Sequence, residues 1–324
     1  MVVQLSARGE FRRMLPLPAV PPKLVAVAPG GVRFALLAQR RRWSKDTQRL
    51  VALGPEGWLV KDLGSLESMG AVTRLRPDRA SPDYVFLVGE RRDRQSAFRL
   101  NVADPSRDLE LSFAGVTGVP EHRAVDVASS AEHILVLDRG GKVFILSNLQ
   151  PVRYLGQFDT ELRSPLALAL VPAVGQEAPE GGPQAYACVL PSGRAAKCIH
   201  VWRFRVAADG KPVVVKVGTF PDPERFPAEL QLSSPVAMAA AFPDRPERLY
   251  VLDRGGSQVR VFDVADIAAK LVQRLQPDIP AKPLLDALPF QGEGLDLAIG
   301  PGQVIHVADQ SSEAIHTYAR QGGK

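Results

Sequence analysis

The sequence predicts an all-β fold, a six-bladed β-propeller, from three observations. The hexapeptide VLDRGG occurs at 136–141 and returns letter for letter at 251–256, with a shorter echo at 307–309. Each copy lies between two apolar, β-prone runs. The 28 prolines and 27 glycines are spread along the chain, which is typical of many short strands separated by turns. A motif that recurs in this setting indicates a repeat architecture.

The repeat extends in both directions and gives six repeat units. In the best-marked unit we expect strands at 124–128, 132–138, 142–146 and 152–158, with Gly140 and Gly141 in a tight hairpin turn. We predict that residues 1–324 form a single β-propeller domain, with seven blades as the alternative. The approximate unit ranges are 19–66, 67–117, 118–160, 161–230, 231–290, and 291–324 together with 1–18.

The two ends of the sequence complement each other. The last repeat unit ends after its third strand, and residues 1–18 belong to no unit of their own. We predict that this N-terminal segment supplies the outer strand that the last blade lacks. Pairing of the two termini would then close the ring and remove exposed sheet edges.

Composition narrows the class of protein. The net charge of +5 is mildly basic and permits an acidic protein, nucleic acid or an anionic surface as partner. The sequence has no apolar run of the length that a signal peptide or a membrane span requires. Its two cysteines provide no disulfide framework. We therefore expect a cytoplasmic protein that does not associate with membranes.

Residues 250–263 (YVLDRGGSQVRVFD) resemble the NHL repeat, in which a strand, an aspartate, a turn and a second strand follow in order. Residues 304–318 match it more loosely. The resemblance implies an NHL-like six-bladed propeller. Some six-bladed relatives, the gluconolactonase and paraoxonase-like enzymes, hold calcium through Glu, Asn and Asp, and certain NHL propellers bind RNA through a basic face.

The recurring aspartates Asp138, Asp253 and Asp309 each end the second strand of a unit. There a carboxylate can accept hydrogen bonds from the N–H groups of the turn. A single active site does not need the same residue in several blades, so we interpret all three as structural turn residues rather than as metal ligands or acids.

Cys188, Cys198 and His200 lie around a turn centred on Gly193. Antiparallel pairing about that centre would place the two cysteines opposite each other. A zinc site would need a fourth ligand, which the sequence does not show. We predict two reduced core cysteines, no metal, no cofactor and no catalytic residue.

Cations follow the second strand in five of the six repeat units. Equivalent loops of repeated units emerge on one face, so these side chains would surround one rim of the propeller. Trp43 adds an aromatic ring to the densest cluster. The members of this predicted basic ring, besides Trp43, are Arg40, Arg41, Arg42, Lys45, Arg91, Arg92, Arg94, Arg139, Lys142, Arg194, Lys197 and Arg254.

These patterns predict a non-enzymatic interaction module, a monomeric propeller that presents its basic face to a protein partner within a hetero-complex. Two alternatives remain open at this point. One is a propeller that binds RNA, with arginines on phosphates and an aromatic ring stacked on a base. The other is a lactonase-like, metal-dependent hydrolase.

Overall fold

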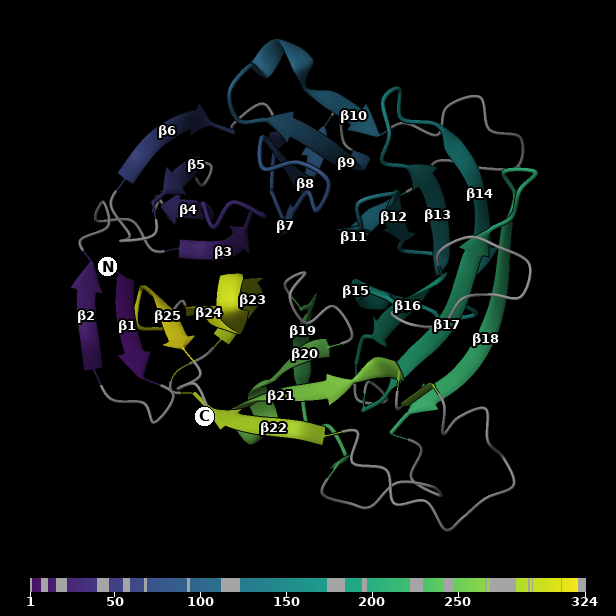
Figure 1. Cartoon of the computed structure of the whole chain (residues 1–324). Helices are drawn as coiled ribbons and strands as arrows, with labels where there is room; N and C mark the ends of the chain where they lie inside the picture. Colours follow the sequence, from purple (N-terminus) through teal and green to yellow (C-terminus); the bar gives the residue numbers. More distant parts are fainter. Residues whose placement is uncertain are drawn as a thin grey trace. The chain divides into compact units, whose positions relative to one another are not determined.

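The computed structural model describes residues 2–6, 11–15, 22–39, 47–54, 59–66, 69–91, 94–111, 123–173, 184–193, 197–221, 230–241, 248–265, 267–268, 284–290, 292, 294–309 and 311–319. These residues form six sheets, five of four strands and one of five (Figure 1). The fold is an all-β, six-bladed β-propeller, as predicted, and not the seven-bladed alternative.

Each sheet is one blade, numbered here in chain order. Blade 1 contains β3 (Pro22–Val27), β4 (Arg33–Gln39), β5 (Thr47–Leu53) and β6 (Leu59–Ser65). Blade 2 contains β7 (Arg74–Pro77), β8 (Tyr84–Arg91), β9 (Arg94–Asn101) and β10 (Leu109–Leu111). Blade 3 contains β11 (Ala124–Ser129), β12 (His133–Asp138), β13 (Lys142–Ser147) and β14 (Tyr154–Asp159).

Blade 4 contains β15 (Pro165–Pro172), β16 (Gln184–Pro191), β17 (Ile199–Val206) and β18 (Pro212–Phe220). Blade 5 contains β19 (Pro235–Ala240), β20 (Arg248–Asp253), β21 (Gln258–Asp263) and β22 (Leu284–Pro289). Blade 6 contains β23 (Gly294–Gly300), β24 (Val304–Asp309), β25 (Ala314–Ala319), β1 (Val2–Ser6) and β2 (Phe11–Leu15). In the described part of the chain, three short 3-10 helices lie in connections: η2 (Pro105–Arg107), η4 (Arg254–Gly256) and η5 (Pro301–Gln303).

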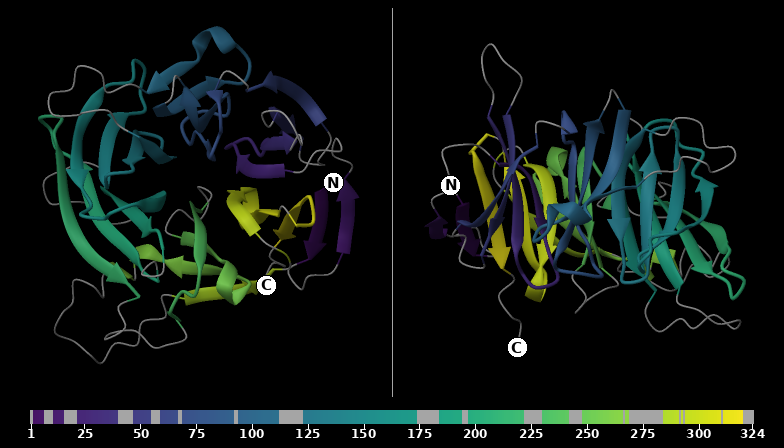
Figure 2. Two further views of the ribbon diagram at one scale, coloured as in Figure 1. Left: turned by 180° about the vertical axis from the view of Figure 1, so that it is seen from behind. Right: turned by 90° about the horizontal axis from the view of Figure 1, so that it is seen from above.

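The N-terminal segment completes the last blade, as predicted. β1 pairs with β25 in parallel, with Val2 opposite Ile315, and β2 pairs with β1 in an antiparallel hairpin. Figures 1 and 2 show β1 and β2, in purple, beside the yellow strand β25. The segment therefore adds two strands where the sequence predicted one.

The chain divides into two compact lobes. Lobe 1 comprises Met1–Val127, Phe242–Asp244 and Phe290–Lys324, and lobe 2 comprises Ala128–Ala241 and Arg245–Pro289. Blades 1, 2 and 6 belong to lobe 1, and blades 4 and 5 belong to lobe 2. The boundary falls within β11, the first strand of blade 3.

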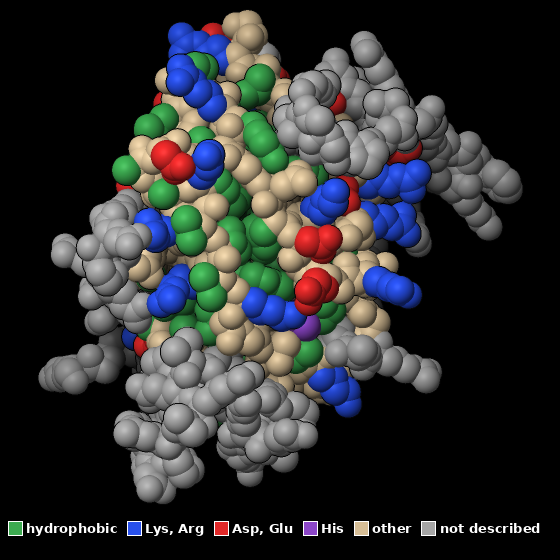
Figure 3. Space-filling model, turned by 90° about the vertical axis from the view of Figure 1, so that its right-hand side faces the viewer, with side chains coloured by type: hydrophobic (Ala, Val, Ile, Leu, Met, Phe, Trp, Pro, Cys, Tyr) green, Lys and Arg blue, Asp and Glu red, His purple; other side chains and the backbone are tan. Residues whose placement is uncertain are grey.

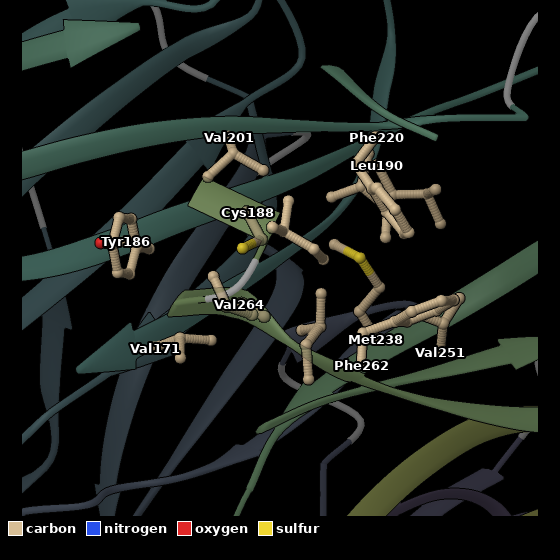
Figure 4. Packing of buried hydrophobic residues seen from close by; sticks show 14 of the residues in the cluster. Val171, Tyr186, Cys188, Leu190, Val201, Phe220, Met238, Val251, Phe262 and Val264 are labelled. Atoms are coloured by element: carbon tan, nitrogen blue, oxygen red, sulfur yellow. The ribbon is translucent and has the colours of Figure 1, made fainter. Parts of the chain in front are cut away.

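The core of each lobe lies between neighbouring sheets. In lobe 2, Cys188 and Leu190 of β16 pack with Met238, Val251 and other apolar residues of blade 5 (Figure 4). Phe220 and Phe262 meet edge to face, with 5.1 Å between ring centroids. Lobe 1 has comparable clusters between blades 1 and 2 and between blades 1 and 6. Strands such as β16 carry near-continuous apolar runs because both of their faces are covered.

The apolar pattern at 71–75 (AVTRL) predicts the first strand of blade 2, and the observed strand begins later than this. β7 starts at Arg74, and the backbone N–H of Val72 instead donates a hydrogen bond of 2.9 Å to Oε1 of Gln48 in blade 1. This shift brings Arg76 and Pro77 into β7. Among the described residues, no helix has the length and apolar character needed to cross a membrane.

Candidate functional site

The predicted basic ring corresponds to one type of connection, the turn between the second and third strands of a blade, here called the second turn. Arg91 ends β8 and Arg94 begins β9, and the two residues pair with each other at the second turn of blade 2. The remaining ring residues of blades 1 and 2, together with one of blade 4, lie outside the described residues: Arg40, Arg41, Arg42, Trp43, Lys45, Arg92 and Arg194.

In lobe 2, four residues of the predicted basic ring lie within the described residues. Arg139, Lys197 and Arg254 are exposed and lie in the second turns of blades 3, 4 and 5. Lys142 is half-buried at the start of β13. Because the three blades repeat one topology, these three exposed cations project from the same edge of lobe 2.

Hydrogen bonds attach each second turn to the segment that enters a neighbouring first strand. Thr160 donates from its backbone N–H and its Oγ1 to the carbonyl of Gly141, at 2.9 and 2.6 Å. The backbone N–H of Ser192 donates to the carbonyl of Ser164 at 3.1 Å. Gly141 has a φ of +90° and lies against the carbonyl of Leu162, so a side chain there would clash. These bonds join the second turns of blades 3 and 4 to the same segment, 160–164.

The aspartate of the hexapeptide has a different environment in each copy. Asp253 is fully buried, and its carboxylate accepts hydrogen bonds from the N–H groups of Ser233 (3.0 Å) and Ser234 (2.7 Å). Asp138 is only half-buried, and it accepts a 2.6 Å bond from the N–H of Gly140 in its own turn. The aspartate of the same hexapeptide thus links two segments in blade 5 and shapes a turn in blade 3.

A basic side chain on the third strand also contacts this aspartate in two blades. Nε of Arg260 lies 3.5 Å from Oδ2 of Asp253 in blade 5. In blade 6, Nε2 of His316 lies 3.3 Å from Oδ2 of Asp309. Ser312 places its Oγ 2.7 Å from both Asp309 Oδ2 and His316 Nε2. Since the carboxylate and the hydroxyl meet the same ring nitrogen, this group lacks the relay of a catalytic triad, in which they contact opposite nitrogens.

We expect Asp253→Ala to destabilise the protein far more than Asp138→Ala. Loss of Asp253 leaves two N–H groups without their acceptor and removes a buried partner of Arg260, so the cost should be about 3 kcal/mol. Loss of Asp138 should cost about 1 kcal/mol. Urea unfolding of both variants provides the measurement. Equal losses would mean that burial does not distinguish the two copies.

The sequence analysis missed a buried charge cluster in lobe 1. Arg76, Asp126 and Asp296 are 7%, 0% and 1% exposed, and each is the third residue of a first strand, in β7, β11 and β23. Nη2 and Nε of Arg76 lie 3.1 and 3.0 Å from the two oxygens of Asp126. Its Nη1 donates to Oδ1 of Asp296 at 2.9 Å. Oδ2 of Asp296 accepts the N–H of Val25 in β3 at 3.3 Å.

Electrostatics fix the charge state of Arg76. Burial alone would lower the pKa of its guanidinium, but the charges of Asp126 and Asp296 outweigh burial and raise that pKa above its ordinary value. Arg76 is therefore a permanent cation between two carboxylates. The signal available in the sequence was a charged residue within otherwise apolar first strands, as at Asp126 and Asp296.

The cluster does not fit the calcium site of a lactonase-like propeller. Calcium requires six to eight oxygen ligands, several of them carboxylates. Both inner carboxylates contact the Arg76 guanidinium, whose charge would repel a divalent cation at the same oxygens. In the described part of the chain, no three His, Cys, Asp or Glu side chains are placed to hold a metal ion together.

The predicted pairing of the cysteines is wrong. Cys188 lies opposite Val201, not Cys198, because the connection after Pro191 is longer than a turn centred on Gly193. Cys198 precedes β17, and its Sγ lies 3.6 Å from Nε2 of His200. Burial raises the pKa of both thiols, that of Cys188 to about 12. Both cysteines are free, and Cys188 is part of the core of lobe 2.

Comparison with known proteins shows similarity of fold. The β-propeller domain of Cps50 (Swd1) from Myceliophteria thermophila matches with a TM-score of 0.56 and 11% identity, over 95% of this chain and 100% of that chain. A chain of a Mitotic Checkpoint Complex matches with a TM-score of 0.54 and 12% identity, over 96% and 92%. The periplasmic gluconolactonase PpgL of Pseudomonas aeruginosa matches with 0.53 and 16%, over 97% and 86%.

No family profile and no curated protein sequence matches the chain. The likeness to the NHL repeat therefore remains a resemblance carried by residues 250–263. What the chain shares with these structures is the propeller fold.

Proposed function

We propose that this protein is a non-enzymatic interaction module that binds a protein partner through its basic second turns. The observation that carries the proposal is the repeated placement of exposed cations, Arg139, Lys197 and Arg254, in the second turns of three successive blades. The second turns of blades 1 and 2 contribute further arginines in sequence, including Arg91 and Arg94 at the ends of β8 and β9.

Three further observations support an interaction role. The buried carboxylates of the first strands are engaged by Arg76 rather than arranged around a metal position. The recurring aspartates hold backbone segments. The similar chain of the Mitotic Checkpoint Complex belongs, by its name, to a protein assembly. Charges around an interface direct encounter and select the partner.

The six-arginine variant tests the proposed function. We expect that changing Arg40, Arg41, Arg42, Arg91, Arg92 and Arg94 together to Ser weakens partner binding at least tenfold, since rim charges contribute roughly 0.2–1 kcal/mol each. The melting temperature should change little, because exposed charges contribute little to stability. Affinity capture of the native partner, followed by titration of the purified pair, provides the measurement.

The outcomes separate the alternatives. Unchanged partner binding by the six-arginine variant would contradict the role of these loops. A large drop in melting temperature would show that the arginines are structural. Salt-sensitive binding of single-stranded RNA that exceeds binding of the protein partner would favour the nucleic-acid alternative instead.

A further inference from the structure

The exposed cations of lobe 2 fall into two groups that differ in their partners. On the outer strand β18 and the connection before it, Lys216 forms a 2.7 Å ion pair with Glu161, and Lys211 lies 3.6 Å from Asp209. Figure 3 views the side on which β14 and β18 lie and shows basic and acidic side chains next to each other there. Lys216 and Lys211 on this side are therefore each paired with an acidic residue of the protein.

At the second-turn edge, the exposed cations have no acidic partner among the described residues. They are Arg139, Arg163, Lys197 and Arg254. Arg163 was not part of the predicted ring. It lies in the connection from β14 to β15, whose backbone is bonded to the second turns of blades 3 and 4 through Thr160 and Ser164.

The acidic groups near this edge are already engaged. Asp253 accepts the N–H groups of Ser233 and Ser234, and Asp159 accepts the N–H of Glu161 at 2.7 Å. The hydrogen bond from Lys216 lowers the pKa of Glu161, so this carboxylate stays ionised and is neutralised by that lysine. Among the exposed described residues of the second turns of lobe 2 and of the segment 159–164, four are cations and two are acidic, Asp159 and Glu161. Lys216 offsets the charge of Glu161, so positive charge exceeds negative charge at this edge.

Arg163 is held by a constrained backbone. Glu161 and Ser164, on either side of it, have φ values of 61° and 62°, which are uncommon for residues other than glycine. The bonds of Thr160 to Gly141 and of Ser192 to Ser164 maintain this conformation. A fixed presentation reduces the entropy lost on binding, and strain of this kind occurs often at functional sites.

We propose that the second-turn edge of lobe 2 receives an acidic, Asp/Glu-rich segment of a partner protein, which crosses blades 3, 4 and 5 and pairs with Arg139, Arg163, Lys197 and Arg254. This inference rests on the proposed function and specifies the partner's chemistry. A peptide fits better than RNA, because the described residues of these turns include no aromatic side chain on which a base could stack. Aromatic residues of blade 4, such as Trp202 and Phe204, are buried in packing.

A fluorescent peptide of ten glutamates tests the inference by anisotropy, with a ten-nucleotide single-stranded RNA as competitor. The site variant carries Arg139→Ser, Arg163→Ser, Lys197→Ser and Arg254→Ser. The matched control, Lys61→Ser, Arg107→Ser, Arg153→Ser and Lys211→Ser, removes the same charge from exposed positions elsewhere. We expect the site variant to bind the peptide about tenfold more weakly and the control less than twofold more weakly.

Equal weakening by the two variants would overturn the inference, since only net charge would then matter. Preferential binding of the RNA would overturn it too. If the six-arginine variant loses the native partner and this site variant still binds it, the proposed interaction module is supported. The assignment of the acidic segment to lobe 2 is then wrong. If both variants keep the partner, the proposed function itself fails. Unchanged melting temperatures are required for each comparison.

Discussion

Replacing Arg76 by Met is expected to lower the free energy of unfolding by about 3–5 kcal/mol, because it removes the cation that contacts both buried carboxylates. Asp126 then keeps Arg74, whose Nε lies 3.8 Å from its Oδ2. Asp126 and Asp296 are almost completely inaccessible to solvent, so water does not replace the guanidinium. Arg76 also joins strands β7, β11 and β23 of lobe 1, and the Asp296 contact extends to β3. Urea unfolding followed by fluorescence or circular dichroism provides the measurement.

Two further variants separate lost charge compensation from lost packing. The triple variant Arg76→Met, Asp126→Leu and Asp296→Leu should recover part of the stability, since buried ion pairs can often be exchanged for apolar groups of similar volume. Arg76→Lys should lie in between, because one ammonium does not reproduce the paired contacts that Nε and Nη2 make with Asp126. A triple variant less stable than Arg76→Met would show that packing, not unpaired charge, dominates.

The fold was predictable because its determinants are local and repeated. Apolar runs such as 132–138 and 142–146 predict two strands, and the short turn between them predicts a hairpin. The other repeat units show the same pattern. β12 (His133–Asp138) and β13 (Lys142–Ser147) lie within one residue of these predictions. The parallel pairing of β1 with β25 was not predictable, since both orientations satisfy the same unpaired backbone edge.

Register was the weaker part of the sequence interpretation. A symmetric turn about Gly193 would place Cys188 opposite Cys198, whereas the structure pairs Cys188 with Val201. Strand register depends on the number of residues in the connection. The sequence PSGRAA after Leu190 does not show how many of its residues belong to the turn. A shift of this size moves a side chain to a different neighbour, so proposed metal ligands are sensitive to it.

The candidate site was predictable in part. Arg139, Lys197 and Arg254 could be placed by counting strands, because a second turn is defined by topology alone. The sequence did not show which cations are paired. Lys216 reaches Glu161, 55 residues away in sequence, whereas Arg163 remains exposed beside it. Long-range contacts of this kind depend on how blades 3 and 4 pack within lobe 2.

The buried cluster was missed for a related reason. Asp126 and Asp296 lie in the apolar runs 124–128 and 294–299, which predict first strands, but the third member, Arg76, falls outside the run 71–75. A lone aspartate within a first strand indicates no partner. Only when β7 begins at Arg74 do all three charges occupy the same register, and then their opposite signs explain why the protein tolerates them in its interior.

Deletion of residues 1–18 is expected to abolish cooperative folding or to yield a protein that aggregates. The deletion removes β1 and β2, so one edge of β25 loses its backbone partner from Ile315 to Ala319, while β24 still pairs with the other edge. β25 also contributes the buried residues Ile315 and Tyr318 to blade 6. An exposed edge beside a buried apolar face favours pairing with other chains. Size-exclusion chromatography and thermal unfolding provide the measurement.

Addition of a synthetic peptide of residues 1–18 to the deleted protein separates lost pairing from a general effect of truncation. Because β1 contacts the rest of the chain by backbone pairing with β25, the peptide should bind in trans and restore a cooperative transition. A peptide with Gln4→Pro should fail, since proline removes an N–H group from the middle of the strand. If the deleted protein remains monomeric and as stable as the full chain, β1 contributes nothing to blade 6. In that case the edge of β25 is protected by its own side chains, and closure of the last blade by the N-terminus is not what keeps this sheet from pairing with other molecules.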